Sequence, residues 1–316
     1  MNTERSIAAK RVFRLSLTTA LALAGGYALQ LPLPFLAPIF AFILTATPSP
    51  PMGLKGLLAL NLLVIVTLGM GLLLIPVLTH YPATALLLVA VGLYFSNYLS
   101  VGLGKGAVGS LLAVGLTMIS AAGTLSFALA FTVIQALVLG IGLAVLCQRI
   151  VYPFFSEAGA PPPAPKTKAA GSDQSNWIAL RATLIVLPAY FLLLTNPMLY
   201  LPIIMKAVSL GQQGSIINAR NAGRELLGST FLAGCFAILF WFALDLMTNL
   251  WMFFLLMLLF GIYFSSKLYR ILPSRFPASF WTNVVTTMLI LLGPAVEDSA
   301  SGNDVYKAFA VRMMLF

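Results

Sequence analysis

Residues 55–78 read KGLLALNLLVIVTLGMGLLLIPVL, a stretch in which Lys55 is the only charged residue. The apolar residues are continuous rather than alternating, which is typical of a helix that is apolar on all sides and not of a half-buried strand. At about 1.5 Å per residue, such a helix is long enough to cross the roughly 30 Å hydrocarbon core of a bilayer. The stretch therefore predicts a transmembrane helix.

The composition extends this prediction to the whole chain. Of the 316 residues, 60% are hydrophobic and only 8% are charged, whereas a soluble domain keeps about a quarter of its residues charged. Most of the outer surface must face lipid, where helices satisfy their own backbone groups. We therefore predict an all-α, polytopic membrane protein. The net charge of +10 fits cytoplasmic loops of such a protein better than nucleic-acid binding.

Apolar runs bounded by proline, glycine and charged residues predict eleven full spans. They cover 13–30, 33–47, 55–78, 83–99, 106–122, 126–150, 177–195, 198–211, 225–245, 249–266 and 278–295. The residues from Asp304 to Phe316 would form a twelfth helix of about 20 Å, which is too short to cross the bilayer. We interpret the twelfth span as truncated at the C-terminus, and a half-span is the alternative.

The distribution of cations predicts the orientation of the spans. With a cytoplasmic N-terminus, the loops on the opposite side contain no lysine or arginine. These loops lie near 31–34, 79–82, 123–125, 196–197, 246–248 and 296–304. The asymmetry is the positive-inside pattern. A cleaved signal peptide at the basic N-terminus is the less favoured alternative.

The two halves of the sequence resemble each other. Four pairs of matching features occur in the same order in both halves: Arg14 and Arg181, LAPIF (36–40) and YLPII (200–204), Lys55 and Arg224, GLYFSN (92–97) and GIYFSS (261–266). We predict two parallel six-helix repeats, 1–153 and 177–316, related by an axis along the membrane normal. The segment 154–176, rich in proline, alanine and serine, is predicted to be a flexible cytoplasmic linker.

Several longer motifs carry a resemblance to a known family. They are the basic N-terminus with Arg14, Ala37-Pro38 in a short second span, PSPPMGLKGLL (48–58), NARNAGRELLGSTFLAG (218–234) and GPAVEDSASGNDVYKAFAVR (293–312). Over nearly its whole length the chain resembles bacterial inner-membrane proteins of the fusaric acid resistance and aromatic acid exporter superfamily, in a compact branch without the large cytoplasmic domain between halves. The resemblance implies efflux of aromatic carboxylic acids or related xenobiotics. It also implies a membrane-fusion adaptor and an outer-membrane channel as partners.

Cations inside apolar helices are the candidate substrate-binding residues. Lys206 lies eight residues inside its predicted helix, about 12 Å deep, where a lysine costs about 2.5–3.5 kcal/mol. It is either an anion site or a lysine that reaches back to the interface. Arg312 would be similarly deep if its helix crosses the membrane. Arg14 and Arg181 lie in the first turns of their predicted spans, either as headgroup anchors or as paired sites at the cytoplasmic mouth.

Acidic residues gather in the outer segment before the last predicted helix. They are Glu297, Asp298 and Asp304. Asp304 is predicted to be a helix N-cap. An outer gate or an adaptor-docking loop is the alternative role for the three.

Signatures of enzymes and cofactors are scarce. GLGKGAVGS (102–110) lacks the spacing of a phosphate-binding loop, and His80 is the only histidine. We expect no catalytic residues, metal or cofactor, and a secondary permease for small organic anions driven outward by the membrane potential. A non-transporting scaffold of an envelope export complex is the alternative, and a membrane enzyme is a third. The sequence is compatible with a homodimer and leaves the substrate and any coupling ion open.

Overall fold

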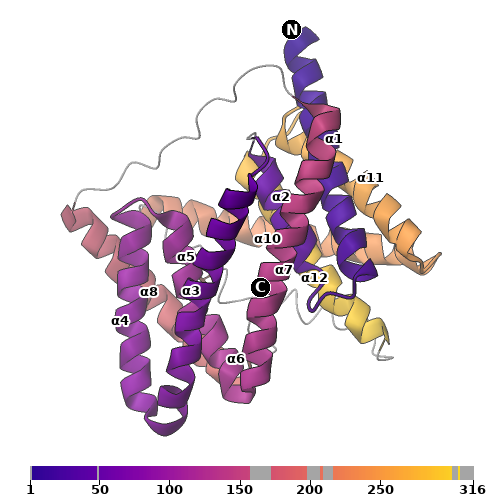
Figure 1. Ribbon diagram of the computed structural model, residues 1–316. Coiled ribbons are helices and arrows are strands. Elements are labelled where there is room, and N and C mark those ends of the chain that lie inside the picture. Colours follow the sequence, from indigo (N-terminus) through magenta and orange to yellow (C-terminus); the bar gives the residue numbers. More distant parts are fainter. Residues whose placement is uncertain are drawn as a thin grey trace. The chain divides into compact units, whose positions relative to one another are not determined.

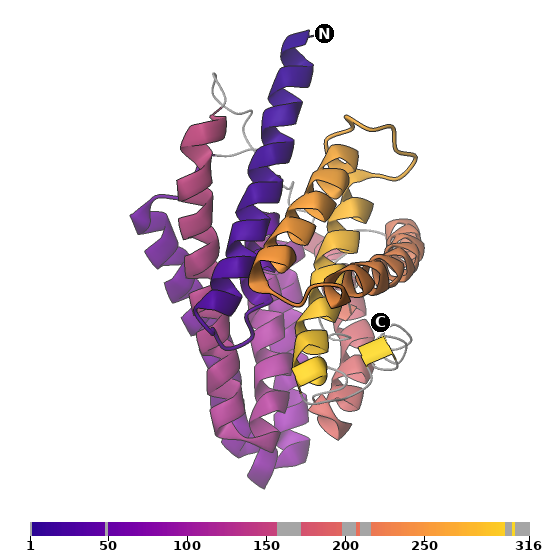
Figure 2. The same cartoon turned by 90° about the vertical axis from the view of Figure 1, so that its right-hand side faces the viewer.

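Figures 1 and 2 show the computed structural model of the chain. The structure describes residues 2–47, 50–156, 172–197, 207–208, 216–300 and 305–306. All regular secondary structure in these ranges is helical, which confirms the predicted all-α class.

The described helices follow one another in chain order. They are α1 (Asn2–Ala28), α2 (Leu36–Ala46), α3 (Leu54–His80), α4 (Pro82–Val101), α5 (Gly106–Val114), α6 (Ser120–Leu125), α7 (Phe127–Val151), α8 (Ser172–Thr195), α10 (Ile216–Asp245), α11 (Leu250–Leu268) and α12 (Ala278–Ala300). A π-helix, η1 (Gly115–Ile119), joins α5 to α6, and a 3₁₀-helix, η2 (Tyr152–Phe155), follows α7.

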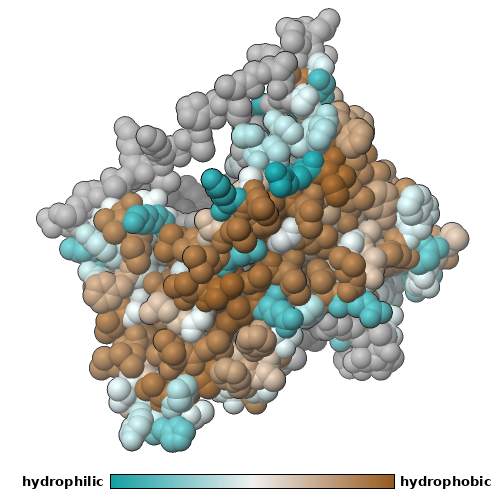
Figure 3. Space-filling view, in the orientation of Figure 1, coloured by the Kyte–Doolittle hydropathy of each residue, from teal (hydrophilic) through white to brown (hydrophobic). Residues whose placement is uncertain are grey.

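Among the described residues, 8 helices are long and apolar enough to cross a membrane. They coincide with the spans predicted at 55–78, 83–99, 106–122, 126–150, 177–195, 225–245, 249–266 and 278–295. A multi-pass membrane protein is thereby supported. Figure 3 shows broad apolar areas on the face in view, and large side chains such as Leu73 and Leu87 are more than 60% exposed, as lipid contact requires.

The other predicted spans have different outcomes. The span at 33–47 corresponds to α2, a shorter apolar helix, and the span at 13–30 lies in α1, which is not among the eight apolar helices. The span at 198–211 lies largely outside the described residues. The total number of spans therefore stays a prediction.

The described helices form two compact units. Unit 1 contains α1, α2, α7 from Ala136, η2, α10 from Leu226, α11 and α12. Unit 2 contains α3 from Leu60, α4, α5, η1, α6, α7 up to Gln135, and α8. Each unit therefore combines helices from both sides of the predicted linker 154–176. The ends of that linker are helical, in η2 and α8, and its residues 157–171 lie outside the described part.

Helix α1 lies at the centre of unit 1, where it packs against α2, α11 and η2. Figures 1 and 2 both place α1 beside α11. The buried side chains of α1 include Leu15 and Leu23 but also Thr18 and Thr19, all at most 1% exposed. The two threonine hydroxyls donate to the carbonyls four residues earlier, at 2.7 and 2.8 Å. A helix enclosed by protein can carry such hydroxyls, which explains why α1 is less apolar than a lipid-facing span.

Unit 2 contains a close crossing of α3 with the π-helix η1. A Cβ atom on Gly71 would meet the carbonyl oxygen of Gly115, and a Cβ atom on Gly115 would meet the carbonyl oxygen of Thr67. The two backbones approach because neither glycine has a side chain. In the same unit α4 packs against α5, η1 and α8.

Candidate functional site

Arg14 lies in the interior of α1 and is 2% exposed. Helix α1 begins at Asn2, so Arg14 is not in its first turn as predicted. Both predicted roles of Arg14, a headgroup anchor and a paired site at the cytoplasmic mouth, stay predictions. The guanidinium lies over the Tyr152 ring, 5.4 Å from its centroid. A desolvated cation–π contact is worth about 2 kcal/mol and offsets part of the cost of burying the charge.

The first half of α1 holds η2 against this arginine. Phe13 stacks on Phe155 with 6.1 Å between ring centroids. The Lys10 ammonium is 3.5 Å from the Ser156 carbonyl oxygen, to which it donates. These contacts hold η2, and with it Tyr152, beside the first half of α1.

Two residues after Arg14, α1 makes a polar contact with α11. The hydroxyl oxygens of Ser16 and Ser265 are 3.3 Å apart, and both residues are at most 1% exposed. The Cβ atom that Gly261 lacks would lie 3.2 Å from the Ser16 Cα atom. The glycine therefore lets α1 and α11 approach closely enough for the two serines to meet.

Unit 2 has a comparable arrangement on α8. Arg181 is half-buried in α8, which begins at Ser172, so this arginine also lies beyond the first turn of its helix. Two residues further on, the Thr183 hydroxyl accepts from the Asn97 amide of α4 at 3.3 Å. Near the start of the same helix, the Tyr94 hydroxyl donates to the Asn176 amide oxygen at 3.2 Å.

A further buried polar contact in unit 2 was not predicted. The hydroxyls of Ser120 and Tyr190 are 3.0 Å apart, and both residues are fully buried. Ser120 directly follows the π-helix η1, a type of helix that frequently marks a functional site. Serine is common in membrane helices, so the sequence carries no signal that would single out this pair.

The remaining predicted site residues have different outcomes. Lys206, Arg312 and Asp304 lie outside the described residues, so their proposed roles stay predictions. Glu297 and Asp298 lie in the last turns of α12, which ends at Ala300, rather than in a loop. Asp298 is half-buried. The described residues include no group of three or more histidine, cysteine or acidic side chains that could hold a metal ion.

Comparison with known proteins gives one match. Residues 11–151 match the sequence profile of a family described as "Protein of unknown function (DUF2955)". The match covers α2 to α7 and most of α1, somewhat less than half of the chain. No curated protein and no solved structure shows a significant match.

Proposed function

We propose that the chain is a secondary permease of the bacterial inner membrane, with a cytoplasmic N-terminus, that exports small organic anions, aromatic carboxylates in particular. The observation that carries the proposal is Arg14, a guanidinium that is 2% exposed in a chain of apolar helices. A charge in such a place is costly, and intramembrane charges typically mark substrate pathways. The resemblance of the sequence to aromatic acid exporters supports the same substrate class.

The helix contacts within the two units support an internal repeat in which the two sequence halves exchange their first helices. The sequence matches relate α1 to α8 and α4 to α11. In unit 1, α1 packs against α11, and in unit 2, α8 packs against α4. Both pairings join the first helix of one half to the fourth helix of the other half.

The contacts at these pairings lie at closely corresponding positions. Arg14 and Arg181 match in sequence, and two residues later Ser16 matches Thr183. Ser16 contacts Ser265 on α11. Thr183 contacts Asn97 on α4, and Asn97 aligns one residue after the counterpart of Ser265 in the GLYFSN and GIYFSS motifs.

Two of the matched pairs of spans are also buried to the same degree in both halves, whereas α3 and α10 differ, with 28% and 39% buried. One third of the central window is buried in α4 and in α11, with 33% in each. The windows at Val108–Leu125 and in α12 are 61% buried in each case. Transporters place substrate sites at such repeats, so we assign one arginine and one polar pair to each copy.

Export of this kind needs no nucleotide. An inside-negative potential of roughly 150 mV contributes ~3.5 kcal/mol to the exit of a monoanion. The arginines would bind the carboxylate by charge-assisted hydrogen bonds. The apolar surroundings would favour an aromatic ring over a small hydrophilic anion.

The test is efflux of 4-hydroxybenzoate from preloaded cells that produce equal amounts of each variant. Removing a charge-assisted hydrogen bond costs about 1.5–3 kcal/mol, so Arg14→Gln should slow efflux about tenfold or more. Arg14→Lys should retain a substantial part of the rate. Arg149→Gln is the matched control, because Arg149 is exposed in the last turn of α7. Unchanged efflux in Arg14→Gln would remove Arg14 from the pathway.

The exchange of helices has its own test, disulfide cross-linking in a chain without Cys147 and Cys235. The exchanged arrangement predicts that Ser16→Cys cross-links with Ser265→Cys. The arrangement without exchange would instead bring Ser16→Cys beside Ser96→Cys, since Ser96 is the sequence counterpart of Ser265. A cross-link in the second pair alone would refute the exchange.

A scaffold in an envelope export complex is the second candidate. The resemblance names an adaptor and an outer-membrane channel as partners for either role. Purified protein in liposomes, with a potassium diffusion potential imposed by valinomycin, separates the two. Potential-driven 4-hydroxybenzoate flux supports the permease, and no flux from a folded protein that still captures an adaptor supports the scaffold.

A further inference from the structure

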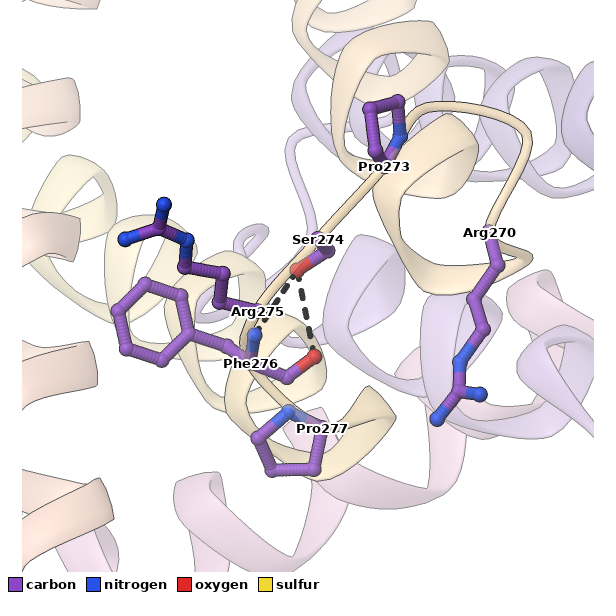
Figure 4. A pocket seen from close by; sticks show the side chains of 6 residues that line it. All are labelled: Arg270, Pro273, Ser274, Arg275, Phe276 and Pro277. Carbon is purple, nitrogen blue, oxygen red and sulfur yellow. Dashed lines mark hydrogen bonds between the residues drawn. The ribbon is translucent and has the colours of Figure 1, made fainter.

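The loop between α11 and α12 combines positive charge with a hollow in the surface. A cavity of about 470 Å³ is lined by Arg270, Pro273, Ser274, Arg275, Phe276 and Pro277 (Figure 4). No acidic residue occurs between Asp245 and Glu297. The loop joins the ends of two candidate spans, Leu250–Leu268 and Ala278–Val296. It therefore lies where the apolar part of two membrane helices gives way to the interface.

Arg270 occupies a backbone conformation that ordinarily favours glycine. Its φ angle is 57°. The Ile271 amide donates to the Ser266 carbonyl at 2.9 Å and the Arg270 amide donates to the Lys267 carbonyl at 3.3 Å. This is the Schellman pattern that closes a helix, with arginine at the left-handed position. The loop between α4 and α5 has Gly104 at its left-handed position, with φ 64°.

The left-handed conformation costs a non-glycine residue about 1–2 kcal/mol. The interaction of an arginine with the helix dipole at a C-terminus stabilises the helix by only about 0.3–1 kcal/mol. Glycine would close α11 at lower cost, so the side chain at residue 270 has a use beyond the turn. Strained residues of this kind cluster at ligand sites.

Hydrogen bonds and ring contacts hold the loop in one shape. The Ser274 hydroxyl oxygen accepts from the Trp281 indole at 2.7 Å and from the Phe276 amide at 3.1 Å. The Lys267 ammonium donates to the Pro273 carbonyl at 2.9 Å. A loop held in this way presents its charges without further ordering, which lowers the entropic cost of binding.

Exposed apolar side chains stand beside the cations. Ile271 is 43%, Leu272 is 38% and Phe276 is 51% exposed. A site for a soluble anion has no need of these three residues. An anionic lipid has both a phosphate for the arginines and acyl chains for the apolar side chains.

We propose that the loop 269–277 binds the phosphate headgroups of anionic phospholipids. Figure 4 shows the side chains of Arg270 and Arg275 extending to opposite sides of the chain segment. Each guanidinium therefore serves its own headgroup rather than sharing one phosphate. The proposal concerns the lipid surface around the protein and is independent of any transported substrate.

The test is native mass spectrometry of the delipidated full chain in detergent, titrated with dioctanoyl-phosphatidylglycerol. A cation near an anionic bilayer surface contributes about 1 kcal/mol, which corresponds to about fivefold in affinity. Arg270→Gly and Arg275→Gln should each weaken binding about fivefold. The double variant should weaken binding at both sites, each about fivefold, because the two sites act separately. Arg270→Lys should stay within about twofold of the original affinity.

The matched control is Lys105→Gln, which removes an exposed cation from the loop between α4 and α5 and should leave phosphatidylglycerol binding unchanged. The thermal midpoint of Arg270→Gly without lipid should not fall, since glycine relieves the left-handed conformation. Equal binding of dioctanoyl-phosphatidylcholine would overturn the proposal. Equal affinity of Arg270→Gly, Arg275→Gln and the original chain would also overturn it. Equally strong binding of glycerol 3-phosphate would assign the site to a soluble phosphate and likewise refute the lipid.

Discussion

Replacing Gly71 by alanine tests the close crossing of α3 with the π-helix. A Cβ atom at residue 71 would lie against the Gly115 carbonyl oxygen and 2.9 Å from both the Gly115 carbonyl carbon and the Ile119 Cβ atom. A carbonyl group in a helix cannot rotate aside, so the two helices must separate. Overpacking of this kind costs about 1–3 kcal/mol. The higher helix propensity of alanine offsets about 1 kcal/mol of this cost. The free energy of unfolding should therefore fall by about 1 kcal/mol.

Gly69 provides a matched control two residues earlier on α3. A Cβ atom at residue 69 would have no neighbouring atom within 4 Å. Gly69→Ala should therefore gain up to about 1 kcal/mol from helix propensity alone. The difference between the two variants isolates the steric cost of the crossing, about 2 kcal/mol.

The free energy of unfolding can be measured by titrating the purified protein from mild detergent micelles into dodecyl sulfate, with helix content followed by circular dichroism. Gly71→Ala should unfold at a lower mole fraction of dodecyl sulfate than the original chain, and Gly69→Ala at an equal or higher one. Equal stability of the two variants would mean that α3 and η1 do not approach each other as described. The packing of unit 2 around Gly115 would then have to be revised.

Three other contacts can be tested by their contribution to the free energy of unfolding. The coupling between Ser16 and Ser265 should be about 0.6 kcal/mol in a double-mutant cycle with alanine, the average for polar contacts between membrane helices; zero coupling would show that the two hydroxyls do not interact. Tyr190→Phe should lower the free energy of unfolding by a similar amount in the original chain but leave it unchanged in the Ser120→Ala variant. Equal losses in both backgrounds would argue against a contact between Ser120 and Tyr190. The Asn249 side chain caps α11 by accepting from the Met252 amide at 2.6 Å. Asn249→Ala should therefore cost about 1 kcal/mol, whereas Asn249→Asp should be close to neutral, and a neutral alanine variant would contradict the cap.

Continuous hydropathy was sufficient to predict the lipid-facing helices. The prediction at 55–78 corresponds to α3, whose central window is only 28% buried, because a helix surrounded by lipid must be apolar on every side. The span predicted at 13–30 lies in a longer helix, since α1 starts at Asn2. The basic residues before this span belong to the same helix, so Arg14 lies well beyond the first turn of α1.

The candidate site was only partly predictable. Arg14 and Arg181 stand out in the sequence, because charges in apolar segments are rare and costly. The Ser120–Tyr190 contact does not stand out, because hydroxyl groups are tolerated throughout membrane helices by donating to a carbonyl one turn earlier. The left-handed conformation of Arg270 also has no signal, since glycine and asparagine are the residues that predict it.

Helix α1 shows what hydropathy measures and what it misses. Hydropathy reports contact with lipid, whereas α1 is enclosed by α2, α11 and η2. Its buried hydroxyls at Ser16, Thr18 and Thr19 donate to carbonyls of the same helix, so their burial leaves no donor unsatisfied. The same enclosure keeps Arg14 away from both water and lipid. Helix α1 is not among the candidate spans of the described residues and yet carries a buried charge, because a helix shielded from lipid can hold a charged group at lower cost.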